Sequence, residues 1–181
     1  TKETLQHSVN RLLAEIKEGL GLTPAEFSRT GRVAKVEDLQ KKINEAKWVT
    51  PEILNEYTDL YTQELQIAAS SSYFFAKLPL TNGLGQREMK WAECLMRGNW
   101  AVYYRSIDGK NVGIYRNISG PNQVPEYAFI ESLPGPVKKQ VSDEVVASRV
   151  EDFEEKFKVV AQKQDIIDGH ENSLQRVFQS L

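Results

Sequence analysis

The last quarter of the chain carries apolar residues at the spacing of a coiled-coil heptad. From Val146 onward the steps between these positions alternate between four and three residues. A period of 3.5 residues keeps one apolar stripe turned toward a partner helix while two helices wind around each other. The sequence therefore predicts one long C-terminal helix. Its apolar stripe, the heptad seam, consists of Val146, Val150, Phe153, Phe157, Val160, Ile167, Leu174, Phe178 and Leu181.

Two polar residues, Gln164 and Glu171, occupy further seam positions, and Gly169 lies between them. A polar seam residue costs stability and can fix the register of a coiled coil. A glycine inside a helix costs about 0.5–1 kcal/mol relative to alanine. We therefore expect the helix to be weakest, and to kink, between Gln164 and Glu171. Pro134 and Pro136 mark its start, because proline cannot continue an upstream helix but suits a first helical turn.

The heptad seam has two interpretations. It packs against the N-terminal helices of the same chain, or it forms an intermolecular coiled coil, parallel or antiparallel. Short heptad runs also occur inside ordinary helical bundles, so the spacing alone leaves both open. In either case we expect residues 1–134 to form a helical domain and residues 135–181 to form the long helix.

The first half of the chain shows helical periodicity. Thr50-Pro51-Glu52 illustrates the start signals, because threonine caps a helix, proline suits the next position and an acid favours the first turn. The five helices expected from such signals cover about residues 3–18, 23–31, 36–47, 50–77 and 86–97.

The period changes near residue 100. Two runs rich in aromatic and β-branched residues, 100–107 and 110–118, flank Asp108-Gly109. Asp-Gly between such runs is a strong signal for a β-hairpin. Residues 127–133 are a candidate third strand. A third strand would stabilise the hairpin, because a two-stranded hairpin alone is marginally stable in water. The predicted fold class is therefore predominantly α (α+β): an N-terminal helical bundle, a small antiparallel hairpin or meander at about 100–118, and the long C-terminal heptad helix.

The hairpin is also a candidate binding surface. Basic and aromatic residues are concentrated there, and its single acid, Asp108, belongs to the turn. Aromatic rings can stack nucleic-acid bases while arginines contact phosphates, and the same residue types are enriched in protein hot spots. A purely structural role is the third interpretation. The candidate residues are Arg97, Trp100, Tyr103, Tyr104, Arg105, Lys110, Tyr115 and Arg116.

Few residues suit catalysis or metal binding. The 181 residues include one cysteine, Cys94, and two histidines, His7 and His170, at opposite ends of the chain. These make no cluster with metal-ligand spacing and leave few parts for nucleophilic chemistry. We therefore expect no enzyme, no catalytic residue, no metal site and no cofactor.

The composition is that of an ordinary soluble protein, with 40% hydrophobic and 27% charged residues. The net charge of −2 gives no global attraction to nucleic acid or to anionic membrane. No apolar run approaches the roughly 18–20 residues of a membrane span, and no signal peptide pattern is visible. An intracellular, cytoplasmic location is the expectation.

Taken together, these patterns favour a non-catalytic structural or adaptor protein. It would self-associate, or bind a helix of another protein, through the heptad seam, as a component of a larger assembly. The alternative is a nucleic-acid-binding accessory protein that uses the aromatic and basic hairpin.

Overall fold

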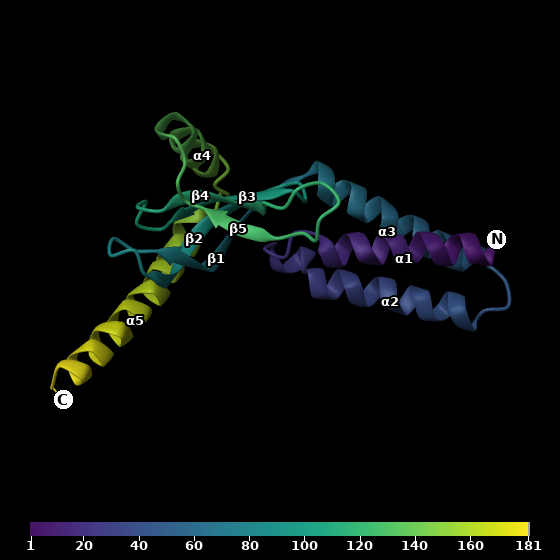
Figure 1. Ribbon diagram of the computed structural model, residues 1–181, viewed down its shortest axis with the longest axis horizontal. Coiled ribbons are helices and arrows are strands. Elements are labelled where there is room, and N and C mark those ends of the chain that lie inside the picture. The colour runs from purple at the N-terminus through teal and green to yellow at the C-terminus, as the bar shows by residue number, and fades with distance from the viewer. Residues whose placement is uncertain (181) are drawn as a thin grey trace. The chain divides into compact units, whose positions relative to one another are not determined.

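The computed structural model describes the backbone of residues 1–180 and the side chains of residues 1–169. Its helices are α1 (Lys2–Glu18), the short 3₁₀ helix η1 (Ala25–Phe27), α2 (Arg29–Glu45), α3 (Pro51–Ala69), α4 (Gly135–Ala147) and α5 (Phe153–Ser180). Its strands are β1 (Ser71–Thr81), β2 (Arg87–Arg97), β3 (Ala101–Ser106), β4 (Val112–Asn117) and β5 (Tyr127–Ile130) (Figure 1).

The chain divides into two compact units. Unit 1 comprises Thr1–Ser72, Met96–Val102 and Tyr115–Ala128, so it holds α1, α2 and α3. Unit 2 comprises Tyr73–Leu95, Tyr103–Ile114 and the chain from Phe129 onward, so it holds most of the sheet together with α4 and α5. The domain boundary predicted between residues 134 and 135 stays a prediction.

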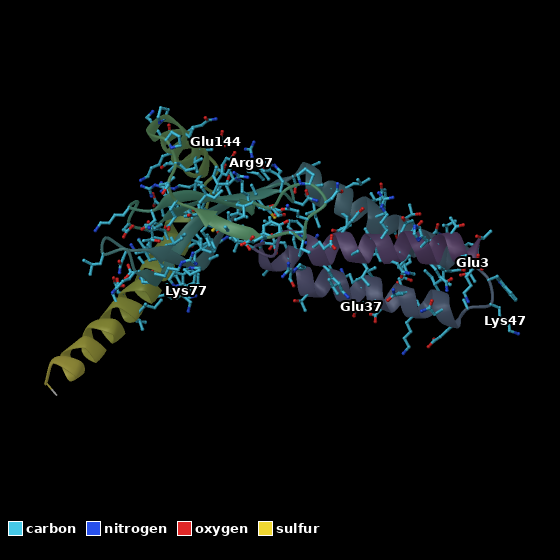
Figure 2. The ribbon with its side chains drawn as sticks, in the orientation of Figure 1. Glu3, Glu37, Lys47, Lys77, Arg97 and Glu144 are labelled. Atoms are coloured by element: carbon cyan, nitrogen blue, oxygen red, sulfur yellow. The ribbon has the colours of Figure 1, made fainter. Side chains whose placement is uncertain are left out.

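The core of unit 1 lies between α1 and α2. Residues three and four apart line one face of a helix, and this spacing buries Leu5, Val9, Leu12, Leu13 and Ile16 of α1 against Val36, Leu39 and Ile43 of α2. Each large aliphatic side chain buried there contributes about 1.5–3 kcal/mol. Glu3 and Glu37 on the helices, and Lys47 in the loop after α2, are exposed on the outer surface (Figure 2). The helix expected at residues 3–18 is confirmed.

The second and third expected helices are one helix, α2. Its N-terminus is capped by Ser28, whose hydroxyl accepts a hydrogen bond of 3.1 Å from the backbone N–H of Gly31. Only η1 forms in the stretch before it. The next helix, α3, begins as expected, with the Thr50 hydroxyl accepting from the N–H of Ile53 and Pro51 in the first turn.

The strands form a meander in the order β1-β2-β3-β4-β5, and the sheet is antiparallel. The β3–β4 hairpin and a strand beginning at Tyr127 agree with the sequence pattern. The helices expected over residues 71–77 and 86–97 are wrong, because both stretches are strands. Residues Ala92–Met96 of β2 are buried without alternation, so both faces of the strand are covered there. Such a run cannot be told from a buried helix by periodicity.

The predicted fold class is corrected accordingly. Helices hold 51% and strands 22% of the chain, and the β element is a five-stranded sheet, not a small hairpin. Asn82 lies between the two helices expected at residues 50–77 and 86–97, and in the structure it belongs to the turn that joins β1 to β2. There the Asn82 side-chain oxygen accepts from the N–H groups of Leu84 and Gln86, and Gly85 adopts a φ of +77°.

The single long heptad helix is also wrong. The C-terminal stretch is divided into α4, which ends at Ala147, and α5, which begins at Phe153. Residues 148–152 between them are not helical, and they interrupt the heptad seam directly after Val146. The side chain of Arg149 in this break is bound to a buried carboxylate of the sheet, Glu93, so a tertiary interaction overrides the local helical pattern.

Gly113 on β4 allows two neighbouring groups to approach its backbone. A side chain at this position would overlap the hydroxyl of Tyr104 and the backbone carbonyl of Ile130. Tyr104 is fully buried, and its hydroxyl has no hydrogen-bond partner among the described protein groups. Its ring contacts that of Phe129 edge to face. The core of unit 2 therefore requires glycine at this position.

We expect Gly113→Ala to lower the free energy of unfolding by about 1–3 kcal/mol through overpacking. Tyr104→Phe removes a buried hydroxyl without a protein partner, so it should leave stability unchanged or raise it. It should also reduce the cost of Gly113→Ala. Urea unfolding of both single variants and the double variant measures this coupling. If Gly113→Ala costs the same in the wild type and in the Tyr104→Phe background, the hydroxyl is not the obstacle.

Candidate functional site

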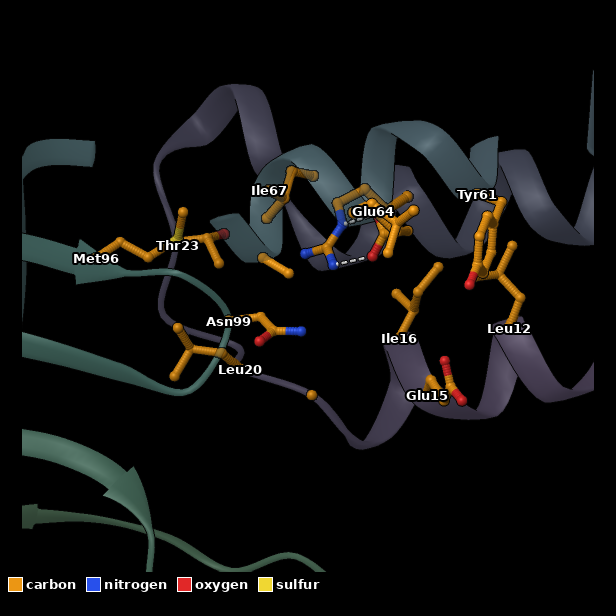
Figure 3. Close-up of a pocket in the computed structure, with 14 residues that line it drawn as sticks. Leu12, Glu15, Ile16, Leu20, Thr23, Tyr61, Glu64, Ile67, Met96 and Asn99 are labelled. Carbon is orange, nitrogen blue, oxygen red and sulfur yellow. Dashed lines mark hydrogen bonds and ion pairs between the residues drawn. The ribbon is translucent and has the colours of Figure 1, made fainter. Parts of the chain in front are cut away.

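A pocket of about 150 Å³ opens in unit 1 beside the C-terminal halves of α1 and α3 (Figure 3). Leu20, Ile67 and Met96 give it apolar walls, while Thr23 and Asn99 add polar groups. An apolar cavity of about this volume can hold a molecule the size of benzene, so the pocket suits one apolar side chain.

The polar wall of this pocket is an ion pair between Arg32 of α2 and Glu64 of α3. The Arg32 Nε and Nη2 groups donate to the two Glu64 oxygens at 2.9 and 2.5 Å, and Nη1 donates to the carbonyl of Phe27 at 3.2 Å. The two side chains are only 12% and 18% exposed. Each guanidinium nitrogen is therefore already engaged, and the pair fixes α3 to α2 rather than presenting a free charge.

A second hollow, of about 280 Å³, continues from the pocket along the helices. It is lined by Ser8, Arg11, Leu12, Glu15, Tyr57 and Tyr61, and shares three of these residues with the pocket. Arg11 and Glu15 on its α1 side pair with each other at 3.3 Å. The two hollows together form the α1–α3 groove. Its lining includes the apolar and aromatic side chains of Leu12, Tyr57 and Tyr61, and the charges of Arg11 and Glu15 at its edge neutralise each other.

One side of the groove continues onto an exposed part of α3. Leu54, Tyr61 and Leu65 are 50%, 45% and 54% exposed. Thr58 lies between them at helical spacing, so the four positions follow one line along the helix. We call Leu54, Thr58, Tyr61 and Leu65 the α3 stripe. Within α3, whose side chains are all described, Ile67 alone is buried, so most of the apolar surface of this helix is left partly uncovered.

The arrangement resembles a four-helix bundle without its fourth helix. Helices α1 and α3 run in one direction and α2 runs in the opposite direction (Figure 1). The backbone of α1 packs closely along α2, and α2 packs against α3, whereas α1 and α3 approach each other much less. In an up-down-up-down bundle the first and third helices lie diagonally and a fourth fills the remaining position. The α1–α3 groove occupies that position.

A cluster of charged residues in unit 2 surrounds Glu93, which is fully buried. Arg149 donates to its two oxygens at 2.7 and 3.1 Å, and Arg105 donates at 3.4 Å. The Tyr73 hydroxyl donates at 2.6 Å. Burial, reinforced by the hydrogen bond and the charge of Glu93, raises the pKa of Tyr73 above its usual range, so this hydroxyl remains a donor. These contacts attach the α4–α5 junction to the sheet.

A further cleft in unit 2, of about 390 Å³, lies between the sheet and α5. Lys90 is only 14% exposed there, and its ammonium group contacts Glu88 at 3.4 Å and Asp108 at 3.5 Å. Burial opposes ionisation of Asp108, but hydrogen bonds from Ser106 and Lys110 and the charge of Lys90 outweigh it and lower its pKa. In the part of the chain with described side chains, no three potential ligands are arranged to hold a metal ion.

The described part of the heptad seam contacts the chain's own sheet. Phe153 stacks on Phe75 of β1, and Val160 is buried. Gln164 accepts a hydrogen bond of 2.7 Å from the N–H of Trp91. The other described seam residues are partly exposed: Val146 in α4, Val150 in the break, and Phe157 and Ile167 in α5. Glu171, Leu174, Phe178 and Leu181 lie outside the residues whose side chains are described.

The hairpin candidates fall into both units. Arg97, Trp100, Tyr115 and Arg116 belong to unit 1, and Tyr103, Tyr104, Arg105 and Lys110 belong to unit 2. Tyr104 is core, and Arg105 is bound to Glu93. Tyr115 stacks on Tyr127, whereas Trp100 is 54% exposed and Lys110 and Arg116 are exposed. Tyr104 and Arg105 are therefore not available as a binding surface, and the remaining candidates are divided between the two units.

Sequence reasoning missed the α1–α3 groove. The apolar positions of α3 were visible as helical spacing, but they cover an arc wider than one neighbouring helix can bury. The signal in the sequence was this wide apolar arc, in which Leu54 and Leu65 add to the face already formed by Ile53 and Leu60.

Comparisons with known proteins identify no relative. No protein-family model, curated protein or solved structure matches this chain. Among the described residues, no helix combines the length and the apolar character needed to cross a membrane.

We expect Arg149→Met to lower the free energy of unfolding by about 3–5 kcal/mol, because it removes the main partner of a buried charge. Glu93→Met should cost less, because Arg149 and Arg105 are 28% and 26% exposed and can reach water. Combining both substitutions should recover part of the loss. Urea unfolding measures all three. A larger cost for Glu93→Met than for Arg149→Met would contradict this account.

Proposed function

We propose that this chain is a non-catalytic protein-interaction module that binds an amphipathic α-helix along the α1–α3 groove and the α3 stripe. The observation that carries the proposal is the open fourth position, which is lined by Tyr61 and Leu65 and continued along α3 by Leu54, all at about half exposure. A helix laid there would contact α1 and α3 at once and could insert one apolar side chain into the 150 Å³ pocket.

The energetics support a modest affinity. Full burial of a leucine or aromatic side chain is worth about 1.5–3 kcal/mol, so covering each half-exposed member of the α3 stripe contributes about 1 kcal/mol. Association itself costs at least about 4 kcal/mol. The anchor in the pocket is therefore needed, because the stripe alone would bind only weakly.

Two observations favour binding over catalysis. Cys94 is fully buried, and burial followed by the negative charge of Glu93 raises the pKa of its thiol, which makes it a poor nucleophile. The Glu93 carboxylate is saturated by Arg149, Arg105 and Tyr73, which leaves it no hydrogen-bonding capacity for a substrate.

Nucleic-acid binding by the hairpin has weaker support. It would need Arg105 and Tyr104 at the surface, but one is engaged with Glu93 and the other is core. The α1–α3 groove offers phosphates no excess of positive charge, since Arg11 pairs with Glu15 and Arg32 with Glu64.

A displayed library of amphipathic helices with a randomised apolar stripe tests the proposal. The helices are about 20 residues long, to match the length of α3. We expect the chain to select peptides from this library. Selected peptides should bind the wild-type chain and lose at least about tenfold in affinity for Leu65→Lys. Fluorescence anisotropy of the synthesised peptides measures the difference.

The matched control is Val159→Lys on α5, because Val159 and Leu65 are similarly exposed, at 52% and 54%. Both substitutions should leave stability within about 0.5 kcal/mol of wild type. If no peptide is enriched, or if Val159→Lys weakens binding as much as Leu65→Lys, the groove is not a helix-binding site.

A further inference from the structure

We infer that the pocket beside α1 and α3 takes the phenol ring of a tyrosine, which the partner helix carries near its N-terminal end. This inference rests on the proposed function, because it names the anchor of the same partner. The proposed function asks only for a side chain whose body is apolar. The pocket also presents a polar group at one wall, the carboxamide of Asn99, and this group selects the far end of the anchor.

The carboxamide of Asn99 has free hydrogen-bonding capacity. Asn99 lies in the turn between β2 and β3, and its side chain points into the pocket (Figure 3). None of the described residues forms a hydrogen bond with this carboxamide. Other polar groups of the pocket are already engaged, because Arg32 pairs with Glu64. The Thr23 hydroxyl likewise donates to the carbonyl of Phe27 at 3.1 Å. Asn99 therefore offers an incoming side chain both a donor and an acceptor.

The turn that carries Asn99 is held against the end of α3. The N–H of Gly98 donates to the carbonyl of Ser70 at 2.8 Å. Gly98 has a φ of +55°, and a side chain there would overlap the carbonyl of Ala68. Asn99 itself has no positive φ, so the turn does not require asparagine at that position. The fold thus fixes the backbone from which the carboxamide extends into the pocket.

The size of the pocket selects a single ring. A cavity of about 150 Å³ holds benzene, and this pocket has that volume. A phenyl or phenol ring therefore fits, whereas an indole is larger by a second ring. Arg32 pairs with Glu64, and Glu15 at the pocket edge pairs with Arg11. A charged anchor would therefore lose its hydration without gaining an unpaired opposite charge.

The carboxamide distinguishes tyrosine from phenylalanine. Asn99 is exposed, so water hydrates its side chain until a partner covers the pocket. A phenylalanine would displace that water without offering a hydrogen bond, which leaves a desolvated polar group. The hydroxyl of tyrosine can donate to Oδ1 or accept from Nδ2 of Asn99. A site of this kind rejects the analogue that lacks the hydroxyl.

The position of the pocket determines where the tyrosine lies in the partner. The pocket lies beside the C-terminal halves of α1 and α3, which run in one direction (Figure 1). A fourth helix of an up-down-up-down bundle runs opposite to them and begins there. Its positive N-terminal end then meets the negative C-terminal ends of α1 and α3. Leu65 and Leu54 are about 16 Å apart along α3, so about three turns of apolar residues follow the tyrosine.

Two small molecules test the pocket without a peptide. These are p-cresol, which has the side chain of tyrosine, and toluene, which has the side chain of phenylalanine. An NMR titration that follows the methyl groups of Leu20, Ile67 and Met96 measures both dissociation constants. We expect the wild type to bind p-cresol about three- to tenfold more tightly than toluene, because one hydrogen bond supplies a ratio of this size. Asn99→Leu should bind toluene at least as tightly as p-cresol.

Equal binding of the two molecules to the wild type overturns the inference, and so does the absence of binding by either. Neither result depends on how well a variant folds. A preference for p-cresol that survives in Asn99→Leu also overturns the inference, because the carboxamide is then not the selecting group.

Competition among helix libraries separates this inference from the proposed function. The libraries fix the anchor as tyrosine, phenylalanine or leucine, and we expect helices with tyrosine near the N-terminal end to be enriched. Enrichment of phenylalanine or leucine anchors instead overturns the tyrosine anchor and leaves helix binding standing. If no helix is enriched while p-cresol binds with the expected preference, the helix-binding function fails and the phenol site stands.

Discussion

The buried carboxylate of Glu93 is the interaction on which unit 2 depends. Placing a charge where it is fully shielded from water costs several kcal/mol unless partners replace the lost hydration. Arg149, Arg105 and Tyr73 supply that replacement from three separate segments. Because Arg149 lies between α4 and α5, satisfying the carboxylate also determines where the helix breaks. Phe153 then lies under the Arg149 guanidinium, with the ring centre 4.0 Å away, and on Phe75.

The Glu93–Arg149 interaction explains why the heptad pattern wrongly predicted a single long C-terminal helix. The spacing of Phe153, Phe157 and Val160 did identify an apolar helix face, but periodicity cannot show whether its partner is a helix or a sheet. A long-range partner 56 positions away in the sequence took Arg149 out of the helix, and no local signal encodes that contact. By contrast, the β3–β4 hairpin was predictable, because its Asp108-Gly109 turn is a local signal.

The errors in the sheet have the same origin. Phe75 continued the helical spacing of α3, and only the strand pairing of the stretch settles its conformation. Pro79 was consistent with β1 as an edge strand, where a missing backbone donor is tolerated. For β2, burial on both sides of Ala92–Met96 erased the alternation that marks a half-buried strand. Helix caps and turns could therefore be predicted from the sequence, whereas strands β1 and β2 could not.

The α3 stripe differs from the rest of the apolar surface because the fold gains little from it. Leu39 and Ile43 on α2 are buried and stabilise unit 1, whereas Leu54 and Leu65 remain half in water and contribute much less. Single exposed leucines are ordinary on protein surfaces. A line of them beside a groove and a pocket, on a helix whose acids lie elsewhere, is different, because covering that line is the only way its apolar area contributes fully to stability. A helix that covers this line would come from outside unit 1, because α2 packs against another part of α3 and α1 lies across the groove from the stripe.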